Sequence, residues 1–380
     1  MSPTSELEHR LSLDENPYGP LPSVRAALRG ARLAANRYPE YLPRRLPGMI
    51  AEQLGVPPDQ VVVGAGATGV IRHILHEFVA PGDGVVMATP TFDGYPVLTE
   101  TIGGRVVEVP LTADGYQDLD AMGEAIDART RMAVLCSPHN PTGTCIGQAD
   151  LEGLLDRIDP SVTVVLDEAY IDFVAKADRV AVADLIVRYP NLVVLRTFSK
   201  AHGLAAPRVG YAFGAVPVIA RIRRRQLPFG VTAPAEAGVR ACYDAEAELA
   251  VRTAAITREC GRLTTGLREL GFAVPTSAAS FVYLDSCGPA EIDRLRAAFV
   301  RDGIQVKHCG TGIRITVGAA AATDAVLAAS ASIPMPGSIF RGHPSQGLSN
   351  AIRDSAAVVP GGSGARVVLR SFRGRLRVRR

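Results

Sequence analysis

The segment from Leu192 to Gly210 carries the side chains with the clearest chemical potential. A valine and leucine run typical of a buried strand ends in Arg196-Thr197-Phe198-Ser199-Lys200, and Arg208 follows eight residues after the lysine. A lysine just past the carboxyl end of a parallel strand lies where open α/β sheets bind ligands, and partial desolvation there favours nucleophilic use. Two hydroxyls and an arginine beside it suit a phosphate. This combination suggests pyridoxal phosphate, although an exposed loop lysine and an arginine paired with a surface acid are the simpler alternative.

The glycine-rich stretch Gly64-Ala65-Gly66-Ala67-Thr68-Gly69 also has the pattern of an anion-binding turn. It follows a short strand, Val61 to Val63, and precedes an apolar helix that we expect to begin near Val70. A strand, a glycine-rich turn and a helix aim free backbone N–H groups at an anion. The stretch lacks the lysine and hydroxyl of a P-loop, which favours a single phosphate group over a nucleotide.

Polar side chains follow two further strands. Ser137-Pro138-His139-Asn140-Pro141-Thr142-Gly143 comes after Met132 to Cys136, and Asp167-Glu168-Ala169-Tyr170 comes after Thr163 to Leu166. A buried aspartate needs a cation, and a pyridinium nitrogen is one, so Asp167 could keep such a nitrogen protonated. Tyr170 and Asn140 could then bond the ring oxygen. A helix cap with a neighbouring surface acid is the alternative for Asp167, and Phe92 could either stack on a ring or belong to the core.

These residues require a fold that brings strand ends together. Strands and helices alternate along the chain, which predicts an α/β protein with a mostly parallel sheet covered by helices on both sides. The expected elements also include an extended arm from Leu11 to Pro22, a helix capped by Ser23 that runs to Arg32, and a long amphipathic helix from Ala237 to Leu270.

Composition narrows the function. The 380 residues are 47% hydrophobic with no membrane span or signal peptide, so we expect a cytoplasmic location. The six cysteines show no metal-ligand or disulfide pattern, and no metal is expected. The net charge is only +3, which gives the body of the protein no pull toward nucleic acid. Seven arginines do gather between Arg366 and Arg380.

With these residues assembled, the chain resembles the fold type I pyridoxal-phosphate aminotransferases, and more narrowly the histidinol-phosphate aminotransferase group. The resemblance spans about residues 11 to 320. It rests on the motifs already quoted together with Asp14-Glu15-Asn16-Pro17-Tyr18-Gly19-Pro20, Asn36-Arg37-Tyr38-Pro39, Pro90-Thr91-Phe92 and Ile313-Arg314-Ile315-Thr316-Val317-Gly318.

The resemblance implies a role for each matching residue. Lys200 would attach to the cofactor and move the substrate proton, with Asp167 and Tyr170 as the other catalytic groups. Cofactor binding is assigned to Ala67, Thr68, Phe92, Asn140, Asp167, Tyr170, Thr197, Ser199, Lys200, Arg208 and Tyr38. Tyr38 would reach the active site of the neighbouring subunit, which implies a homodimer. Substrate binding is assigned to Arg314, for the α-carboxylate, and to Tyr18, Asn16 and Lys307.

The resemblance also implies a seven-stranded large domain, residues 35–235, and a smaller α+β domain, residues 236–331. An arm, residues 1–34, would join the small domain, and a basic tail, residues 332–380, is predicted to be disordered. The predicted reaction is ping-pong transfer of an amino group between amino acid and keto substrates. Lys307 stands where we expect an arginine for a substrate phosphate, so an aromatic or specialised-metabolism aminotransferase is an alternative. A pyridoxal-phosphate decarboxylase and a non-catalytic sensor are the weaker alternatives.

Overall fold

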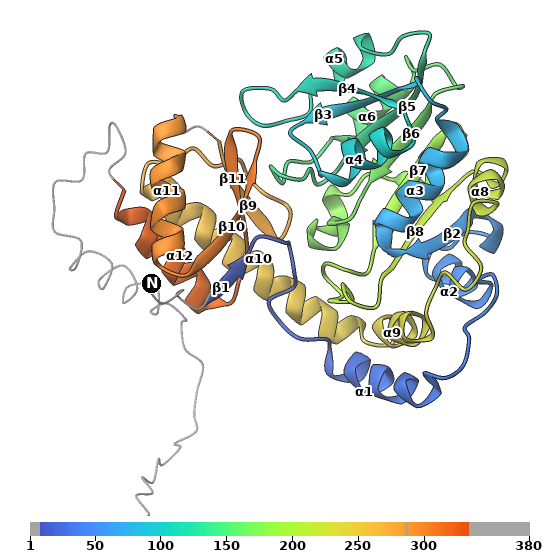
Figure 1. The fold of residues 1–380 in the computed structure, drawn as a ribbon, viewed down its shortest axis with the longest axis horizontal. Coiled ribbons are helices and arrows are strands. Elements are labelled where there is room, and N and C mark those ends of the chain that lie inside the picture. The colour runs from blue at the N-terminus through green and yellow to red at the C-terminus, as the bar shows by residue number, and fades with distance from the viewer. Residues whose placement is uncertain (1–7, 286–287, 334–380) are drawn as a thin grey trace, which may run out of the picture. The chain divides into compact units, whose positions relative to one another are not determined.

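The computed structural model describes residues 8–285 and 288–333, and its larger sheet provides the frame for the rest. This sheet has seven strands in the order β2-β8-β7-β6-β5-β3-β4, and only β8 runs antiparallel to its neighbours (Figure 1). The strands are β2 Val61–Ala65, β3 Gly84–Thr89, β4 Arg105–Pro110, β5 Thr130–Cys136, β6 Thr163–Asp167, β7 Leu192–Thr197 and β8 Val209–Gly214. The predicted α/β class with a mostly parallel seven-stranded sheet is confirmed.

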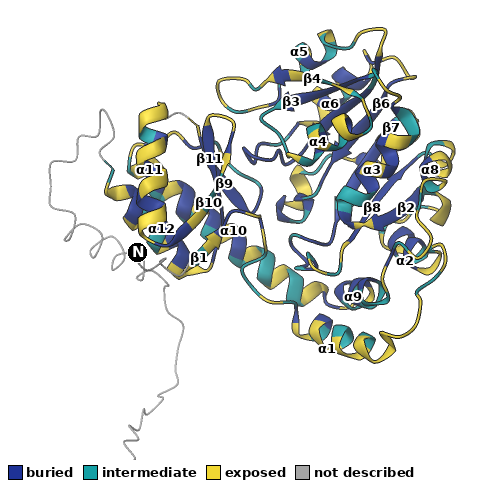
Figure 2. Cartoon of the chain, viewed as in Figure 1, coloured by how far each residue is buried: buried dark blue, intermediate teal, exposed yellow. Residues whose placement is uncertain are grey.

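Alternation along the strands explains why helices cover both faces of this sheet. Val61 and Val63 pack into one core, whereas Val62 packs into a second core on the opposite face. The first core includes residues of α1 Pro22–Ala31, α2 Arg45–Leu54, α5 Leu119–Glu124, α6 Gln148–Leu155, α7 Val182–Arg188 and α9 Ala233–Tyr243. The second includes residues of α3 Gly66–Phe78, α4 Gly94–Thr101 and α8 Val216–Arg223. Figure 2 shows the inner strands of this sheet buried and the outer faces of many helices exposed, while the edge strand β4 is mostly accessible.

A smaller sheet has the strand order β1-β10-β11-β9. Its strands are β1 His9–Leu11, β9 Phe281–Leu284, β10 Ile304–Cys309 and β11 Gly312–Thr316. They share a third core with α10 Glu246–Glu269, α11 Pro289–Arg301 and α12 Ala320–Ala331. Tyr170 and Ala201, which follow strands of the larger sheet, also pack into this core. The ends of those strands therefore meet the smaller sheet.

The N-terminal arm contacts both sheets. Its strand β1 pairs in parallel with β10, while Leu21 and Val24 of the following helix pack into the first core of the larger sheet. The chain between these two points crosses the carboxyl end of β7, because Asn16 donates hydrogen bonds to the carbonyls of Lys200 and Ala201. The division into domains remains a prediction.

Three local predictions were wrong. Ser23 does not cap α1, because the helix begins at Pro22, whose ring fixes the backbone angle that a first helical residue needs. The glycine-rich stretch does not stay a turn up to Val70, because α3 begins at Gly66. The single helix expected from Ala237 to Leu270 is two helices, α9 and α10, separated at Asp244 and Ala245.

The remaining expectations concern features beyond the two sheets. No helix within the described ranges is long and apolar enough to cross a membrane. The predicted basic tail from 332 to 380 lies outside the described residues apart from its first two positions.

Candidate active site

A tight cradle forms where β2, β8 and the first turn of α3 meet. Gly66 has a φ of +74°, and a Cβ there would lie 2.7 Å from Cζ of Arg208. A Cβ at Gly210 would lie 2.7 Å from the carbonyl carbon of Gly66. A side chain at 210 would overlap backbone atoms, and one at 66 would displace the guanidinium of Arg208, which lies directly over the N-terminal end of α3. Ala67 and Thr68, in that first turn, present backbone N–H groups that the helix itself does not use.

Two hydroxyls are held next to this cradle by the end of β7. Thr197 Oγ1 lies 3.0 Å from Ser199 Oγ and accepts a hydrogen bond from the backbone N–H of Ser199 at 3.1 Å. Arg208 has a φ of +58° and donates from Nη1 to the carbonyl of Ala205 at 2.8 Å, which leaves Nη2 over Gly66. The predicted phosphate ligands therefore gather around one helix N-terminus, where anions are favoured.

Lys200 lies three residues beyond β7, against the N-terminal arm. Its ammonium donates to the carbonyl of Asp14 at 3.1 Å and to that of Leu13 at 3.4 Å, and it lies 5.5 Å from the centre of the Tyr170 ring. Burial lowers the pKa of Lys200 from its usual value, and the charge of Arg314 lowers it further, while nearby carboxylates, Asp167 among them, oppose the shift. A lowered pKa increases the fraction of neutral amine that can act as a nucleophile or base.

Asp167 is the last residue of β6, and its carboxylate is buried without a basic partner among the described residues. Tyr95 OH donates to Oδ2 at 2.7 Å, and the backbone N–H of Ala169 donates to Oδ1 at 3.0 Å. Burial raises the pKa of Asp167, whereas these two hydrogen bonds and the charge of Lys200 oppose the rise. The carboxylate and the ammonium therefore act on each other in one site.

Asn140 and Tyr170 belong to a buried network that reaches the smaller sheet. Asn140 donates to Tyr170 OH at 3.3 Å and accepts from Arg314 Nη1 at 2.6 Å. Tyr170 OH in turn donates to Asp14 Oδ2 at 2.9 Å, and Asp14 forms an ion pair with Arg314 at 2.8 Å. Burial, and then the charge of Asp14, raises the pKa of Tyr170 well above its usual value. Residues from the arm, two strand ends and β11 thus form one connected group.

The other predicted substrate residues are engaged elsewhere. Lys307 lies opposite Arg314 on the neighbouring strand, and its ammonium forms a 2.6 Å ion pair with Asp93, the residue before α4. The side chain of Asn16 is taken up by the two carbonyls of the Lys200 loop and by the backbone of Tyr18.

Two predicted aromatic residues lie at the margins of the group. Phe92 lies at the edge of the second core and meets Tyr95 edge to face, with ring centres 6.1 Å apart. Tyr38 is 83% exposed and packs against Phe229, with ring centres 4.7 Å apart. No hydrogen bond links Tyr38 to the other predicted site residues that the structure describes.

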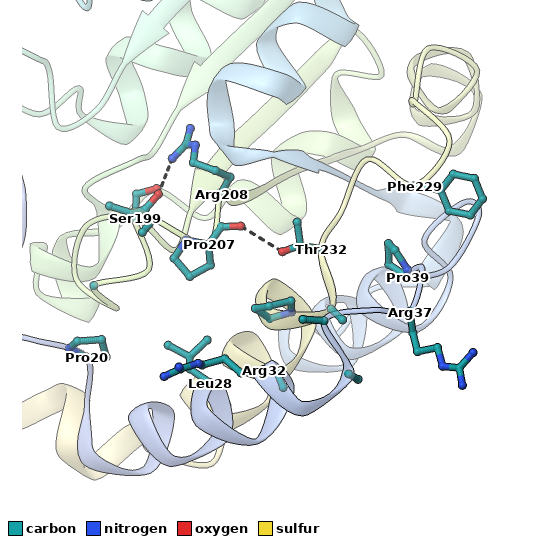
Figure 3. Close-up of a pocket in the computed structure, with 18 of the residues that line it drawn as sticks. Pro20, Leu28, Arg32, Arg37, Pro39, Ser199, Pro207, Arg208, Phe229 and Thr232 are labelled. Carbon is teal, nitrogen blue, oxygen red and sulfur yellow. Dashed lines mark hydrogen bonds between the residues drawn. The ribbon is translucent and has the colours of Figure 1, made fainter.

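A cavity of about 1010 Å³ connects this exposed region with the phosphate cradle. Figure 3 shows Ser199, Pro207 and Arg208 on one side of it and, on the other, Leu28 of α1 and Arg32, the residue directly after that helix. Thr232, which precedes α9, closes one wall by a 3.5 Å hydrogen bond to the carbonyl of Pro207. Tyr18 and Tyr38 also line the cavity.

Comparison with known proteins decides the family. The sequence model described as "Aminotransferase class I and II" matches residues 9–332. The chain belongs to this family. Aromatic amino acid aminotransferases from Streptomyces avermitilis and Rhodococcus opacus are 42% and 41% identical, and the alignments cover 84% of this chain and 89% and 88% of the relatives.

A solved structure agrees with this assignment. Histidinol-phosphate aminotransferase from Sinorhizobium meliloti, in complex with pyridoxal-5'-phosphate, is 26% identical with a TM-score of 0.81, over 86% of this chain and 91% of that one. This protein is a pyridoxal-phosphate-dependent aminotransferase. Its own residues fit the cofactor in two respects: a phosphate cradle that a Cβ at Gly66 would fill, and a buried Asp167 that forms no ion pair within the described part of the chain.

The candidate site also includes three residues whose roles the sequence does not indicate. Tyr95 lies 72 positions from Asp167, and Asp93, which precedes α4, contacts Lys307 of the smaller sheet. Asp14 was quoted only as part of a motif. Each acts through a contact between elements distant in the chain, so no local spacing could have indicated it.

Proposed function

We propose that this aminotransferase transfers the amino group of an aromatic amino acid to a keto acid. Two observations support the aromatic class. Relatives at 41–42% identity are named aromatic amino acid aminotransferases. In addition, the ammonium of Lys307, which a phosphorylated substrate would need as its cation, is already paired with Asp93. The second observation carries the proposal, because it concerns this chain's own residues.

The same ion pair distinguishes the two candidate substrates physically. A phosphate ester brings about two negative charges, and an ammonium already paired with a carboxylate offers it little net attraction. An uncharged aromatic side chain makes no such demand and can pack against Tyr18 and Phe92. Histidinol phosphate remains the second candidate, because the Sinorhizobium meliloti neighbour carries that name.

We assign the cofactor-binding roles as follows. Arg208, Thr197, Ser199 and the N–H groups of Ala67 and Thr68 hold the phosphate, and Tyr170 and Asn140 bond the ring oxygen. Asp167 keeps the ring nitrogen protonated, and Phe92 contacts the ring face. When bound, pyridoxal phosphate supplies an electron-withdrawing ring that makes the substrate α-proton acidic.

The remaining roles concern the substrate. Lys200 would hold the cofactor covalently, and its amine, when free, would be the base that moves the proton at the substrate α-carbon. Arg314 binds the α-carboxylate through its Nε edge, because Nε is buried and has no partner in the described part of the chain. Tyr18 and Lys307 border the side-chain pocket, and Asn16 holds the arm that covers it.

We further propose a homodimer in which Tyr38 contacts the phosphate in the partner subunit's site. The proposal is supported by the exposure of apolar side chains on one segment: Leu33 is 90% exposed, Tyr38 83% and Tyr41 62%. The adjoining cavity reaches Ser199 and Arg208, so a second copy that covers this segment could complete the phosphate site. The cytoplasmic location also remains a prediction.

The substrate assignment is tested by comparing kcat/KM for phenylalanine, tyrosine and histidinol phosphate, with 2-oxoglutarate as the acceptor. We expect kcat/KM to be tenfold or more higher for the aromatic amino acids than for histidinol phosphate. Lys307→Met should leave this preference nearly unchanged. A preference for histidinol phosphate that Lys307→Met abolishes would overturn the aromatic assignment.

A further inference from the structure

We infer that Asp14 is an internal competitor for the substrate carboxylate at Arg314, and that it weakens the binding of every carboxylate substrate of this enzyme. The inference deepens the proposed function, since it rests on the role proposed for Arg314. It adds a specificity-determining residue that lies in the N-terminal arm and not in the sheet that carries the arginine.

Both carboxylate oxygens and the backbone N–H of Asp14 are held by contacts beside Arg314. It is 3% exposed, and its Oδ2 accepts from Arg314 Nη1 at 2.8 Å and from Tyr170 OH at 2.9 Å. Its Oδ1 accepts from Thr316 Oγ1 at 3.1 Å, while its backbone N–H donates to that hydroxyl at 3.0 Å. The φ of Asp14 is +53°, a left-handed conformation that turns the side chain into the site. These contacts therefore hold the carboxylate of Asp14 in one fixed position beside Arg314.

Contacts within the protein already use both terminal nitrogens of the Arg314 guanidinium. Nη1 serves Asn140 and Asp14, and Nη2 donates to the carbonyl of Ser12 at 2.8 Å. Only the buried Nε has no partner in the described part of the chain. A substrate carboxylate would thus meet one free edge of a cation whose charge Asp14 already balances.

Asp14 also spans the two groups that an amino acid substrate must reach. Its carboxylate contacts Arg314, and its own carbonyl accepts from the ammonium of Lys200 at 3.1 Å. A substrate presents its carboxylate and its reacting nitrogen on one carbon, so it needs the same pair of groups. Substrate binding must either displace Asp14 from Arg314 or place a second anion beside it, and both cost affinity.

Asp14→Asn tests this inference because asparagine keeps the size but carries no charge. Its one carbonyl oxygen can still accept from Tyr170, and its amide N–H can donate to the Thr316 hydroxyl. The direct readout is the dissociation constant of two carboxylates that lack an amino group, propionate and 3-phenylpropionate, measured by calorimetry on the holoenzyme. We expect both constants to fall about tenfold or more, the size of one charge-assisted contact. Binding of 2-phenylethanol, which has no carboxylate, should not change.

Kinetics supply a second readout. The KM values of phenylalanine and phenylpyruvate should fall with the same variant, while kcat changes much less, because Asp14 affects binding rather than the reacting atoms. Asp184→Asn, which removes an exposed acid of α7, serves as the matched control and should leave every value at the wild-type level. Asp14→Ser removes the same charge and should act in the same direction, which covers the case in which the asparagine variant does not fold.

The possible failures are distinguishable. If folded Asp14 variants bind the two carboxylates no better than the wild type, although Arg314→Gln weakens that binding, the inference about Asp14 is wrong and the role of Arg314 stands. If Arg314→Gln leaves carboxylate binding unchanged, the proposed role of Arg314 fails, and the inference about Asp14 fails with it.

Discussion

Replacing Gly66 with alanine separates backbone strain from loss of the phosphate clamp. The φ of Gly66 is +74°, where an alanine costs about 1–2 kcal/mol of folding free energy. Its new Cβ would also lie 2.7 Å from Cζ of Arg208. That overlap involves the far end of a flexible side chain, so the guanidinium can swing away without a large further loss of stability. The clash should appear mainly as weaker phosphate binding.

The size of that loss follows from the bond that is broken. A hydrogen bond between a guanidinium and a phosphate contributes about 1.5–3 kcal/mol, which corresponds to roughly a 10- to 150-fold change in a dissociation constant. We therefore expect Gly66→Ala to weaken pyridoxal phosphate binding by that factor in an absorbance titration of the apoenzyme. Binding of pyridoxal, which lacks the phosphate, should be nearly unchanged.

Two other glycines provide matched controls for this variant. Gly55 has a φ of +70° but no heavy atom within 4 Å of a built Cβ, so Gly55→Ala should lose similar stability and no cofactor affinity. Gly48 lies inside α2 with open space around it and no positive φ, so its alanine variant should gain up to about 1 kcal/mol. A Gly66→Ala protein that folds and binds pyridoxal phosphate as tightly as the wild type would refute the clamp.

Two further predictions concern the ring nitrogen and the dimer. Tyr95→Phe removes the 2.7 Å hydrogen bond to Asp167, so the pKa of this carboxyl, already raised by burial, should rise further. Because the acid must stay ionised to hold the ring proton, the acidic limb of the kcat/KM profile should move to higher pH, and an unmoved limb would contradict this. The Tyr38→Ala and Lys200→Ala homodimers should each have low activity. Mixing and reassociating the two variants should restore activity, because one site of each mixed dimer then has both Tyr38 and Lys200. No recovery in verified mixed dimers would show that Tyr38 does not act across the interface.

The positions of Asp167 and Lys200 could be predicted from the sequence because both follow directly from position along a strand. Asp167 ends β6 and Thr197 ends β7, and parallel neighbouring strands bring their carboxyl ends together. Once the alternation of strands and helices indicated a parallel sheet, the convergence of Asp167 with Lys200 was predictable. The antiparallel strand β8, which begins directly after Arg208, was not among the predicted elements, and its direction was not predictable because reversing a strand leaves its apolar pattern unchanged.

Contacts between charged residues that are distant in the chain could not be predicted from the sequence. Asp14 and Arg314 lie near opposite ends of the described chain, and their contact depends on the path of the arm from β1 toward α1. The pairing of Lys307 with Asp93 likewise requires β10 to face the start of α4. The break between α9 and α10 was missed because neither glycine nor proline marks it.

The covalent attachment of the cofactor tests the central claim most directly. The chain contains only three lysines, Lys176, Lys200 and Lys307, so borohydride reduction of the holoenzyme followed by peptide mass spectrometry can assign the modified residue without ambiguity. We predict that the phosphopyridoxyl group is found on Lys200. A folded Lys200→Ala protein should carry no such group and should show no turnover. The group on Lys176 or Lys307, or turnover retained without Lys200, would contradict it.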